Sequence, residues 1–301
     1  MVVRNFTKTA FLKLLPLLLR STQRILQAKP GSNTDGRVPI LVYHKITDLR
    51  LGLDAQWNVP PAMFAEHIAY LRSEKFNVLS LTDFYATLSR KRKLPPKPVV
   101  ITFDDGYASM YRHAYPALKA FGFPATVFIA VDYVEKRSLF WWDRRVLERL
   151  PEAYESLRML SWSEILEMQS SGIISFGSHT MTHPHLGRLP VEKIEYELAT
   201  SKAVLERRLG RTIEFFAYPG GIRHYGDLSR ETKKMLIHCG YRLACTSVFG
   251  RNGFGQNAYE LKRIGIERTD SLPVFKAKIS GGCDWLEAAQ TAFQRVFNNV
   301  Y

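Results

Sequence analysis

One short run of residues limits what this chain can fold into more than any other. Residues 98–107 read Pro-Val-Val-Ile-Thr-Phe-Asp-Asp-Gly-Tyr, so an apolar, β-branched run stops on two carboxylates and a glycine. This pattern predicts a fully buried strand, and α/β proteins place their chemistry at the carboxyl ends of such strands. Because Asp104 and Asp105 are adjacent, they need a nearby cation to stay ionised together. We therefore expect one of them to hold a metal ion.

The rest of the chain alternates between strand and helix patterns. Strands are predicted at residues 38–43, 78–81, 98–103, 125–129, 173–178, 215–218, 243–246 and 262–266. Helices are predicted at residues 60–75, 83–90, 111–121, 161–171, 191–209, 228–239, 273–279 and 285–297. This alternation is typical of βα units around a parallel sheet, and seven or eight strands favour a closed (β/α)7–8 barrel over an open doubly wound sheet. A nucleotide-binding fold is not indicated, because no GxGxxG or Walker loop stands where such a fold would need one.

The chain is expected to hold one catalytic domain at residues 38–301, with an insertion at about 132–160 that carries Phe140-Trp-Trp-Asp143. Residues 30–37 have the composition of a linker. The net charge of +14 is partly concentrated in residues 1–29, which contain six basic residues and no acidic residue. This concentration indicates a basic N-terminal arm more than a nucleic-acid groove. Three cysteines without a CxxC pair exclude a disulfide framework as the basis of the fold.

Residues 6–28 form a cationic amphipathic pattern at helical spacing. Leucine and other apolar residues fall on one face, and Lys13, Arg20 and Arg24 fall on the other, as in helices that lie in a membrane interface. Pro16 weakens this pattern because it should kink the helix. An uncleaved signal or anchor and a helix packed on the domain itself remain alternatives. From the interfacial helix we expect the protein to lie at the periphery of a bacterial inner membrane, on the cytoplasmic face, and not to be exported.

Polar residues follow several of the predicted strands. His44, the Asp104–Asp105 pair, the run His179-Thr-Met-Thr-His183, and Tyr218-Pro219-Gly220 each stand at a strand end, and a parallel barrel brings these ends to one rim. Two histidines four residues apart, combined with a carboxylate, can form a metal site with open positions. A metal held there would lower the pKa of a bound water from about 15.7 towards about 7, and the second carboxylate could then act as a general base. This donor set suits Zn²⁺, with Ni²⁺, Co²⁺ and Fe²⁺ also compatible.

Several of these segments resemble one known family. Thr102-Phe-Asp-Asp-Gly106, His179-Thr-Met-Thr-His183 and Phe216-Ala-Tyr-Pro219 look like the first three motifs of the polysaccharide deacetylases, the NodB-homology enzymes of carbohydrate esterase family 4. The segments Leu41-Val-Tyr-His44, Tyr115-Pro-Ala-Leu118 and Phe123-Pro-Ala-Thr126 are similar to that family as well. The resemblance covers roughly residues 38–282. It implies a deformed (β/α) barrel that removes acetyl groups from N-acetylated sugars with a divalent metal.

The resemblance also implies roles for individual residues. Asp104 matches the general base, Asp105, His179 and His183 match the metal ligands, and the backbone N–H of Gly220 matches an oxyanion-hole donor. Such a donor fits the hydrolysis of an amide. The residues expected to contact the sugar are Tyr107, Tyr218, Pro219, Trp141 and Trp142. For the two tryptophans, stacking on a sugar ring and capping the insertion's own small core are both open.

Two departures from the family pattern concern the proton donor and the residue that orients the base. The third motif usually begins with an arginine, where this chain has Phe215 and Phe216, and the late strand at 261–266 lacks the usual histidine. We hypothesise that His44 acts as the general acid and that Arg263 orients the base. The alternatives are a structural hydrogen bond for His44 and a salt bridge on the barrel for Arg263.

The sequence therefore predicts a hydrolase that removes N-acetyl groups from amino sugars of a cell-surface polysaccharide or of its precursor. If the protein lies at a membrane, the precursor could be lipid-linked. The alternative is a glycan-binding protein that retains the metal site but has lost turnover. A glycosidase is excluded. Its two catalytic carboxylates stand at least about 5 Å apart and face each other across the scissile bond, which Asp104 and Asp105, as neighbours at one strand end, do not manage. No nucleic-acid partner is expected, and the sequence does not indicate the oligomeric state.

Overall fold

The computed structural model describes residues 36–90 and 92–290. The predicted N-terminal helix, nearly all of the linker at 30–37 and the end of the predicted helix at 285–297 lie outside these residues. None of the helices in the described part is both long and apolar enough to cross a membrane.

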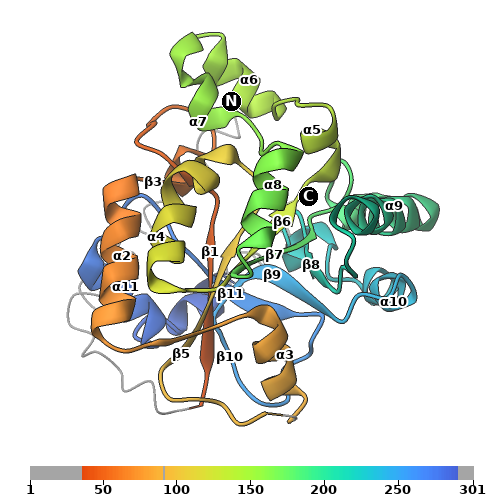
Figure 1. Ribbon diagram of the computed structural model, residues 1–301. Coiled ribbons are helices and arrows are strands. Elements are labelled where there is room, and N and C mark those ends of the chain that lie inside the picture. The colour runs from red at the N-terminus through yellow and green to blue at the C-terminus, as the bar shows by residue number, and fades with distance from the viewer. Residues whose placement is uncertain (1–35, 91, 291–301) are drawn as a thin grey trace, which may run out of the picture.

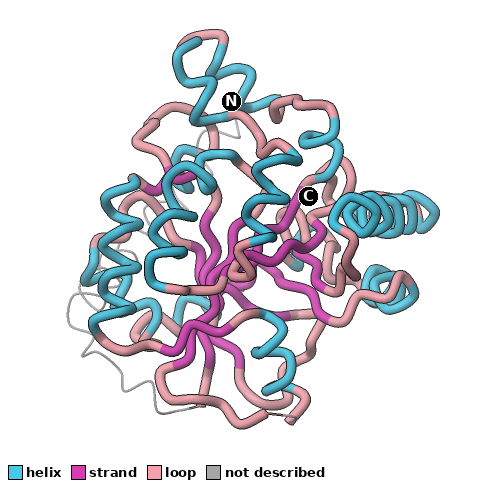
Figure 2. The backbone as a smooth tube through the Cα atoms, viewed as in Figure 1, coloured by secondary structure: helices cyan, strands magenta, loops and turns pink. Residues whose placement is uncertain are grey.

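Seven parallel strands form a closed ring at the centre of the molecule (Figures 1 and 2). In pairing order they are β1 (Val38–Tyr43), β11 (Leu261–Gly265), β9 (Leu243–Phe249), β8 (Phe215–Ala217), β7 (Ile174–Ser178), β6 (Ala125–Ile129) and β5 (Pro98–Phe103). The ring closes because β5 also pairs with β1, with Ile40 opposite Val100. The predicted barrel is thus confirmed, with seven strands.

Four short strands lie outside the ring. They are β4 (Asn77–Leu79) beside β5, β10 (Arg251–Asn252) antiparallel to β1, and the pair β2 (Lys45–Ile46) and β3 (Asn58–Val59). The predicted strand at 78–81 is this β4. It falls outside the ring because its single neighbour among the described residues is β5.

Helices cover the outside of the ring, as Figure 2 shows. They are α2 (Pro61–Ser73), α4 (Tyr115–Phe121), α8 (Trp162–Ser170), α9 (Val191–Leu209), α10 (Arg230–His238) and α11 (Leu272–Ile279), while α3 (Leu81–Leu88) packs on the interior cluster. A π-helical segment, Met110–Ala114, precedes α4 and takes up the first part of the helix that was predicted from 111. The helix α3 lies at the end of the barrel opposite α6 and α7 (Figure 1).

The core has two main parts because successive strand residues point to opposite faces. Ile40, Val100 and Phe128 belong to one cluster together with Leu81 and Phe84 of α3. Strand residues of the alternate set pack in a larger cluster against the surrounding helices. The barrel interior is therefore filled by side chains, and chemistry is left to its rim.

The insertion folds as α5 (Val131–Glu135), α6 (Trp141–Leu147), a short 3-10 turn and α7 (Tyr154–Leu157). Its end pairs with the chain just after the two aspartates: Ala108 donates its N–H to the carbonyl of Arg158 (2.9 Å), and Leu160 donates to Gly106 (2.8 Å). These two hydrogen bonds join the end of the insertion to the segment that follows β5.

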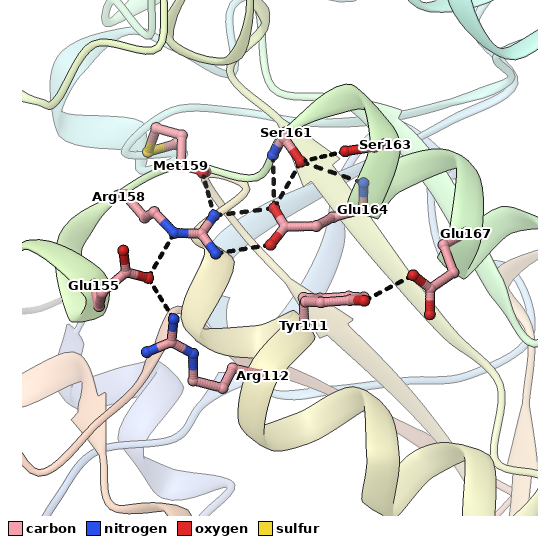
Figure 3. Close-up of polar contacts among 9 residues, drawn as sticks. All are labelled: Tyr111, Arg112, Glu155, Arg158, Met159, Ser161, Ser163, Glu164 and Glu167. Atoms are coloured by element: carbon pink, nitrogen blue, oxygen red, sulfur yellow. Dashed lines mark hydrogen bonds and ion pairs between the residues drawn. The ribbon is translucent and has the colours of Figure 1, made fainter.

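An ion-pair network fixes the junction between the insertion and α8 (Figure 3). Arg158 donates to both carboxylate oxygens of Glu164 (2.7 and 3.0 Å) and to Glu155 (2.9 Å). Glu164 also accepts from the N–H of Ser161 at 2.8 Å, which completes a capping box at the start of α8. One guanidinium therefore joins α7 to α8.

Candidate active site

Asp104, the first residue after β5, forms a buried ion pair with Arg263 of β11. Its side chain is 3% exposed, and Arg263 donates Nη1–H to Oδ1 (2.7 Å) and Nη2–H to Oδ2 (2.6 Å). Burial acts to raise the pKa of Asp104, but the Arg263 guanidinium outweighs burial and leaves that pKa below its usual value. Asp104 is consequently held as a carboxylate at neutral pH.

Arg263 is itself fixed inside the barrel. It donates Nε–H to the carbonyl of Thr246 (2.8 Å), and its guanidinium lies 5.9 Å from the centre of the Phe128 ring. The two interpretations considered for Arg263 therefore coincide in the structure: it is a salt bridge, and its partner is the carboxylate that matches the base.

Asp105, His179 and His183 converge as the sequence predicted. Their ligand atoms all lie within 4.8 Å of one another, with Asp105 Oδ1 3.4 Å from Nε2 of His179 and 3.2 Å from Nε2 of His183. Two ligands bound tetrahedrally to one zinc at about 2.0–2.1 Å stand about 3.4 Å apart. Oδ1 of Asp105 is buried and accepts no hydrogen bond from the described residues. The three side chains therefore fit a divalent metal.

The surroundings prepare the histidines for that role. Nδ1 of His179 lies 2.8 Å from the carbonyl oxygen of Ala217, which can only accept, so Nδ1 carries the proton and the lone pair of Nε2 points to Asp105. Burial by itself would raise the pKa of Asp105, but His179 and His183, when protonated in the metal-free site, hold that pKa well below its usual value.

Left-handed backbone conformations cluster at this site. Asp105, Thr180 and His183 have φ angles of 72°, 68° and 61°. Residues with a Cβ adopt this region at a cost of about 1–3 kcal/mol each. All three belong to the metal site or to the turn that joins its histidines. The backbone is therefore strained at the residues that orient the metal ligands.

His44 follows β1 and lies beside the same carboxylates. Its ring is 5.4 Å from that of Trp57, and its Nδ1 is buried without a hydrogen-bond partner in the described part of the chain. Burial lowers the pKa of His44, while Asp105 and Asp104 act in the opposite direction. The structural hydrogen bond considered as an alternative for Nδ1 is not formed with any described residue.

Gly220 follows β8 in a left-handed conformation, with φ of 69°. A Cβ there would stand 2.2 Å from Cε1 of His185, so the close contact with this ring requires glycine. His185 is held by Asp227, with Nδ1 3.1 Å from Oδ2, and therefore supports the turn rather than the metal triad. The N–H of Gly220 donates to no atom of residues 36–90 or 92–290.

Three of the residues expected to contact the sugar are buried in the structure. Tyr107 and Tyr218 are fully buried, and their hydroxyls donate to Asp143 Oδ2 (2.7 Å) and to the carbonyl of Tyr259 (2.9 Å). Their side chains therefore belong to the core beneath the site. Pro219 is also buried and accepts from the N–H of Gly221 at 2.8 Å.

The two tryptophans of α6 differ in their surroundings. Trp142 stacks on Phe140, with ring centres 4.5 Å apart, and lies 5.8 Å from the ring of His183. Trp141 is 47% exposed, with the guanidinium of Arg145 at 5.0 Å from its ring. Trp142 therefore packs against the main core rather than the insertion's own small cluster, and Trp141 is the more exposed of the two.

Lys45 and Asp143 also contribute to the site, which sequence reasoning missed. Lys45 is 1% exposed and donates to Asp143 (2.6 Å) and Asp54 (2.6 Å), while Asp143 accepts from Tyr107. Burial raises the pKa of Asp143 to about 6, although Lys45 counteracts it. This network fixes the insertion to β2. The available signal was a lysine directly after the strand-end His44.

Comparisons with known proteins agree with this geometry. The family model described as polysaccharide deacetylase matches residues 91–244. YxkH of Bacillus subtilis is 28% identical over 243 residues, covering 81% of this chain and 76% of YxkH. The poly-beta-1,6-N-acetyl-D-glucosamine N-deacetylase of Staphylococcus aureus is 28% identical over 218 residues, covering 70% of this chain and 68% of that protein.

Solved structures show the same similarity over most of the chain. The Streptococcus pyogenes deacetylase PplD, solved in complex with acetate, is 26% identical, with a TM-score of 0.66, and covers 81% of this chain and 98% of its own. IcaB from Ammonifex degensii is 26% identical, with a TM-score of 0.67, and covers 81% and 97%. With the strand-end aspartates, the paired histidines and the seven-stranded barrel in place, this chain belongs to the polysaccharide deacetylase family.

Proposed function

We propose that this protein is a metal-dependent deacetylase that removes N-acetyl groups from GlcNAc-type residues of a cell-surface polysaccharide or of its precursor. The observation that carries the proposal is the division of the adjacent aspartates, with Asp104 kept ionised by Arg263 and Asp105 directed at His179 and His183. The names of the Staphylococcus aureus relative and of the acetate-bound PplD support the same reaction and the N-acetylglucosamine polymer as substrate class.

Asp105, His179 and His183 would hold a divalent metal, which supplies Lewis-acid polarisation of the amide and a lowered pKa for water. Asp104 accepts the proton of the attacking water. Each of its carboxylate oxygens has two lone-pair sites, so the bidentate contact with Arg263 leaves a site on each oxygen for that proton. The new bond joins the water oxygen to the acetyl carbon, and the C–N bond of the amide breaks.

Gly220 and His44 serve the two charges that develop during this step. The N–H of Gly220 would donate to the oxygen of the attacked carbonyl, as an oxyanion-hole donor does. His44 would give a proton to the departing amine, so that acetate and a free amino sugar are the products. Trp141, which is exposed and lies against Trp142, would stack on a sugar ring of the substrate.

The proposal predicts acetate release that depends on metal. Purified protein treated with a chelator is expected to release no acetate from short GlcNAc oligomers, and added Zn²⁺, Ni²⁺ or Co²⁺ is expected to restore release. An enzymatic acetate assay measures both states, and heat-denatured protein with the same metals is the control. Glycan binding without any acetate release would favour the alternative of a binding protein.

His44→Ala is expected to lower kcat for an N-acetyl sugar by about 100- to 10,000-fold, the usual range for a lost general acid. Hydrolysis of 4-nitrophenyl acetate should fall far less, because nitrophenolate leaves without a proton. Both rates are measured on one metal-loaded preparation. An unchanged kcat on the amide would remove His44 from the reaction.

The place of the reaction is a further part of the proposal. The six basic residues of the segment 1–29, with no acidic residue, would hold the enzyme at an anionic membrane surface, where a lipid-linked precursor is accessible. Sedimentation with anionic vesicles, compared with neutral vesicles, tests this location. Failure to sediment would leave a soluble polymer as the substrate.

A further inference from the structure

The turn that carries the two metal-binding histidines is held from one side by a buried carboxylate. Glu197, on α9, is 6% exposed. Its Oε2 accepts the N–H of Met181 and of Thr182, both at 2.8 Å, and its Oε1 accepts the hydroxyl of Thr182 at 2.6 Å. All three bonds go to the two residues midway between His179 and His183.

The opposite side of the turn is held by the first residues of α5. Val131 donates its N–H to the carbonyl of Thr180 (3.2 Å), and Asp132 donates to the carbonyl of Met181 (2.9 Å). The N–H groups of Met181 and Thr182 thus donate to Glu197, and the carbonyls of Thr180 and Met181 accept from α5. Inside the turn, the N–H of His183 donates to Thr180 Oγ1 at 2.9 Å.

This double attachment opposes a real strain. Thr180 and His183 both have positive φ angles, a region that residues with a Cβ normally avoid. A free turn would relax towards ordinary backbone angles and carry the His183 ring away from Asp105. Hydrogen bonds to a charged acceptor are stronger than those between neutral groups, so the contacts of Glu197 oppose this relaxation.

Glu197 has no evident task in the helix itself. It forms no ion pair with any residue in the described ranges, and it occupies the inward stripe of α9 with Ile194, Leu198 and Ser201. A carboxylate buried without a cation is costly unless hydrogen bonds satisfy it. Here every satisfying bond outside α9 comes from the metal-site turn.

We propose that Glu197 is a positioning residue of the metal site: it holds Met181 and Thr182 so that the Nε2 atoms of His179 and His183 meet Oδ1 of Asp105. This inference rests on the metal site of the proposed function and adds a determinant of metal affinity. The side chain at position 197 must be long enough to reach the turn and must present an acceptor oxygen, because it accepts hydrogen bonds from backbone N–H groups.

Metal affinity tests this proposal directly. Glu197→Ala and Glu197→Asp, which removes one methylene of reach but keeps the charge, are expected to bind Zn²⁺ about 10- to 100-fold more weakly, as outer-shell changes do. Glu197→Gln keeps the reach and one acceptor oxygen, and should bind close to the wild-type value. Competition with a chromogenic chelator gives the dissociation constants, and the visible spectrum of the Co²⁺-loaded protein reports ligand geometry.

Leu205→Ala is the matched control. Leu205 lies two turns further along α9, is fully buried and makes none of the hydrogen bonds that hold the turn. It should lower the unfolding temperature of the metal-free protein without changing Zn²⁺ affinity or the Co²⁺ spectrum.

The Zn²⁺ affinities of these variants distinguish a positioning role from its absence. If Glu197→Asp binds Zn²⁺ as tightly as wild type, or if Glu197→Gln loses affinity while Glu197→Asp keeps it, the positioning role is wrong. If Glu197→Ala does not fold, the Asp and Gln variants decide alone. Absence of Zn²⁺ binding by the wild type would instead contradict the proposed function.

Discussion

Replacing Asp104 by asparagine is expected to lower kcat/KM for deacetylation by about 100- to 10,000-fold, while Zn²⁺ affinity stays close to that of wild type. In the wild type Arg263 donates to both carboxylate oxygens of Asp104. The amide oxygen of asparagine can still accept one of these hydrogen bonds. The amide cannot take the proton of the attacking water. Acetate release under substrate-limiting conditions gives kcat/KM, and chelator competition gives the affinity.

The neighbouring variant Asp105→Asn is the matched control, since it makes the same chemical change one residue along. It should weaken Zn²⁺ binding by more than the about 10- to 100-fold that outer-shell changes produce, because Oδ1 of Asp105 faces both histidines. Excess Zn²⁺ should recover part of the activity of Asp105→Asn and none of that of Asp104→Asn. Equal responses to metal in the two variants would contradict the division of roles between these residues.

Much of the site could be predicted because it depends on where strands end. The run at 98–103 is short, apolar and β-branched, and the run before His179 is short and begins with two isoleucines. They became β5 and β7 with boundaries within one residue. Once a parallel barrel is assumed, its geometry alone brings Asp105, His179 and His183 to one rim. Their convergence follows without any knowledge of side-chain packing.

Contacts that depend on packing were not predictable in the same way. Tyr107 and Tyr218 stand next to site motifs, where aromatic residues often stack on sugars, and only the tertiary structure shows both to be fully buried. The positive φ angles of Asp105, Thr180 and His183 carry no local signal, because residues with a Cβ normally avoid that region. Such conformations persist only where surrounding contacts impose them.

Glu197 is an intermediate case, because a signal for it was present. Its position falls within the inward stripe of a long helix at 191–209, whose bounds were predicted correctly. A charged residue in an apolar stripe contradicts the helical pattern and therefore indicates a specific partner. The pattern marks the residue, while the identity of its partner requires the fold.

Arg263→Met is expected to reduce the free energy of unfolding by about 3–5 kcal/mol at neutral pH, the usual cost of breaking a buried ion pair. Both side chains are nearly inaccessible, at 1% and 3% exposure, so the abandoned Asp104 carboxylate would have no water to replace the guanidinium. Denaturant unfolding monitored by circular dichroism measures the change. Arg208→Met removes the same bidentate contact from Glu135 at the surface and should change the free energy of unfolding far less, because water replaces an exposed ion pair.

The pH dependence of this loss has a defined sign. In the wild type the pKa of Asp104 lies below its usual value, so the pair stabilises the fold above the unfolded-state pKa of about 3.9 and less so as pH falls through the folded pKa. Without Arg263, burial dominates and raises the pKa of Asp104, so the variant gains stability as pH falls. The difference between the two proteins should therefore shrink towards acid pH, whereas a constant difference would mean that lost packing, not the charge on Asp104, causes the effect.

Activity should follow the same titration, because Asp104 must be ionised to accept a proton. Arg263→Lys keeps the charge but cannot make the bidentate contact, so the pKa of Asp104 should rise and the acidic limb of the kcat/KM profile should move to higher pH. The profile is measured by acetate release from GlcNAc oligomers at saturating Zn²⁺, with Arg208→Lys as the control. An acidic limb that stays in place in Arg263→Lys would show that Asp104 is not the base whose ionisation limits the reaction, and the distinction between the two aspartates would then rest on metal binding alone.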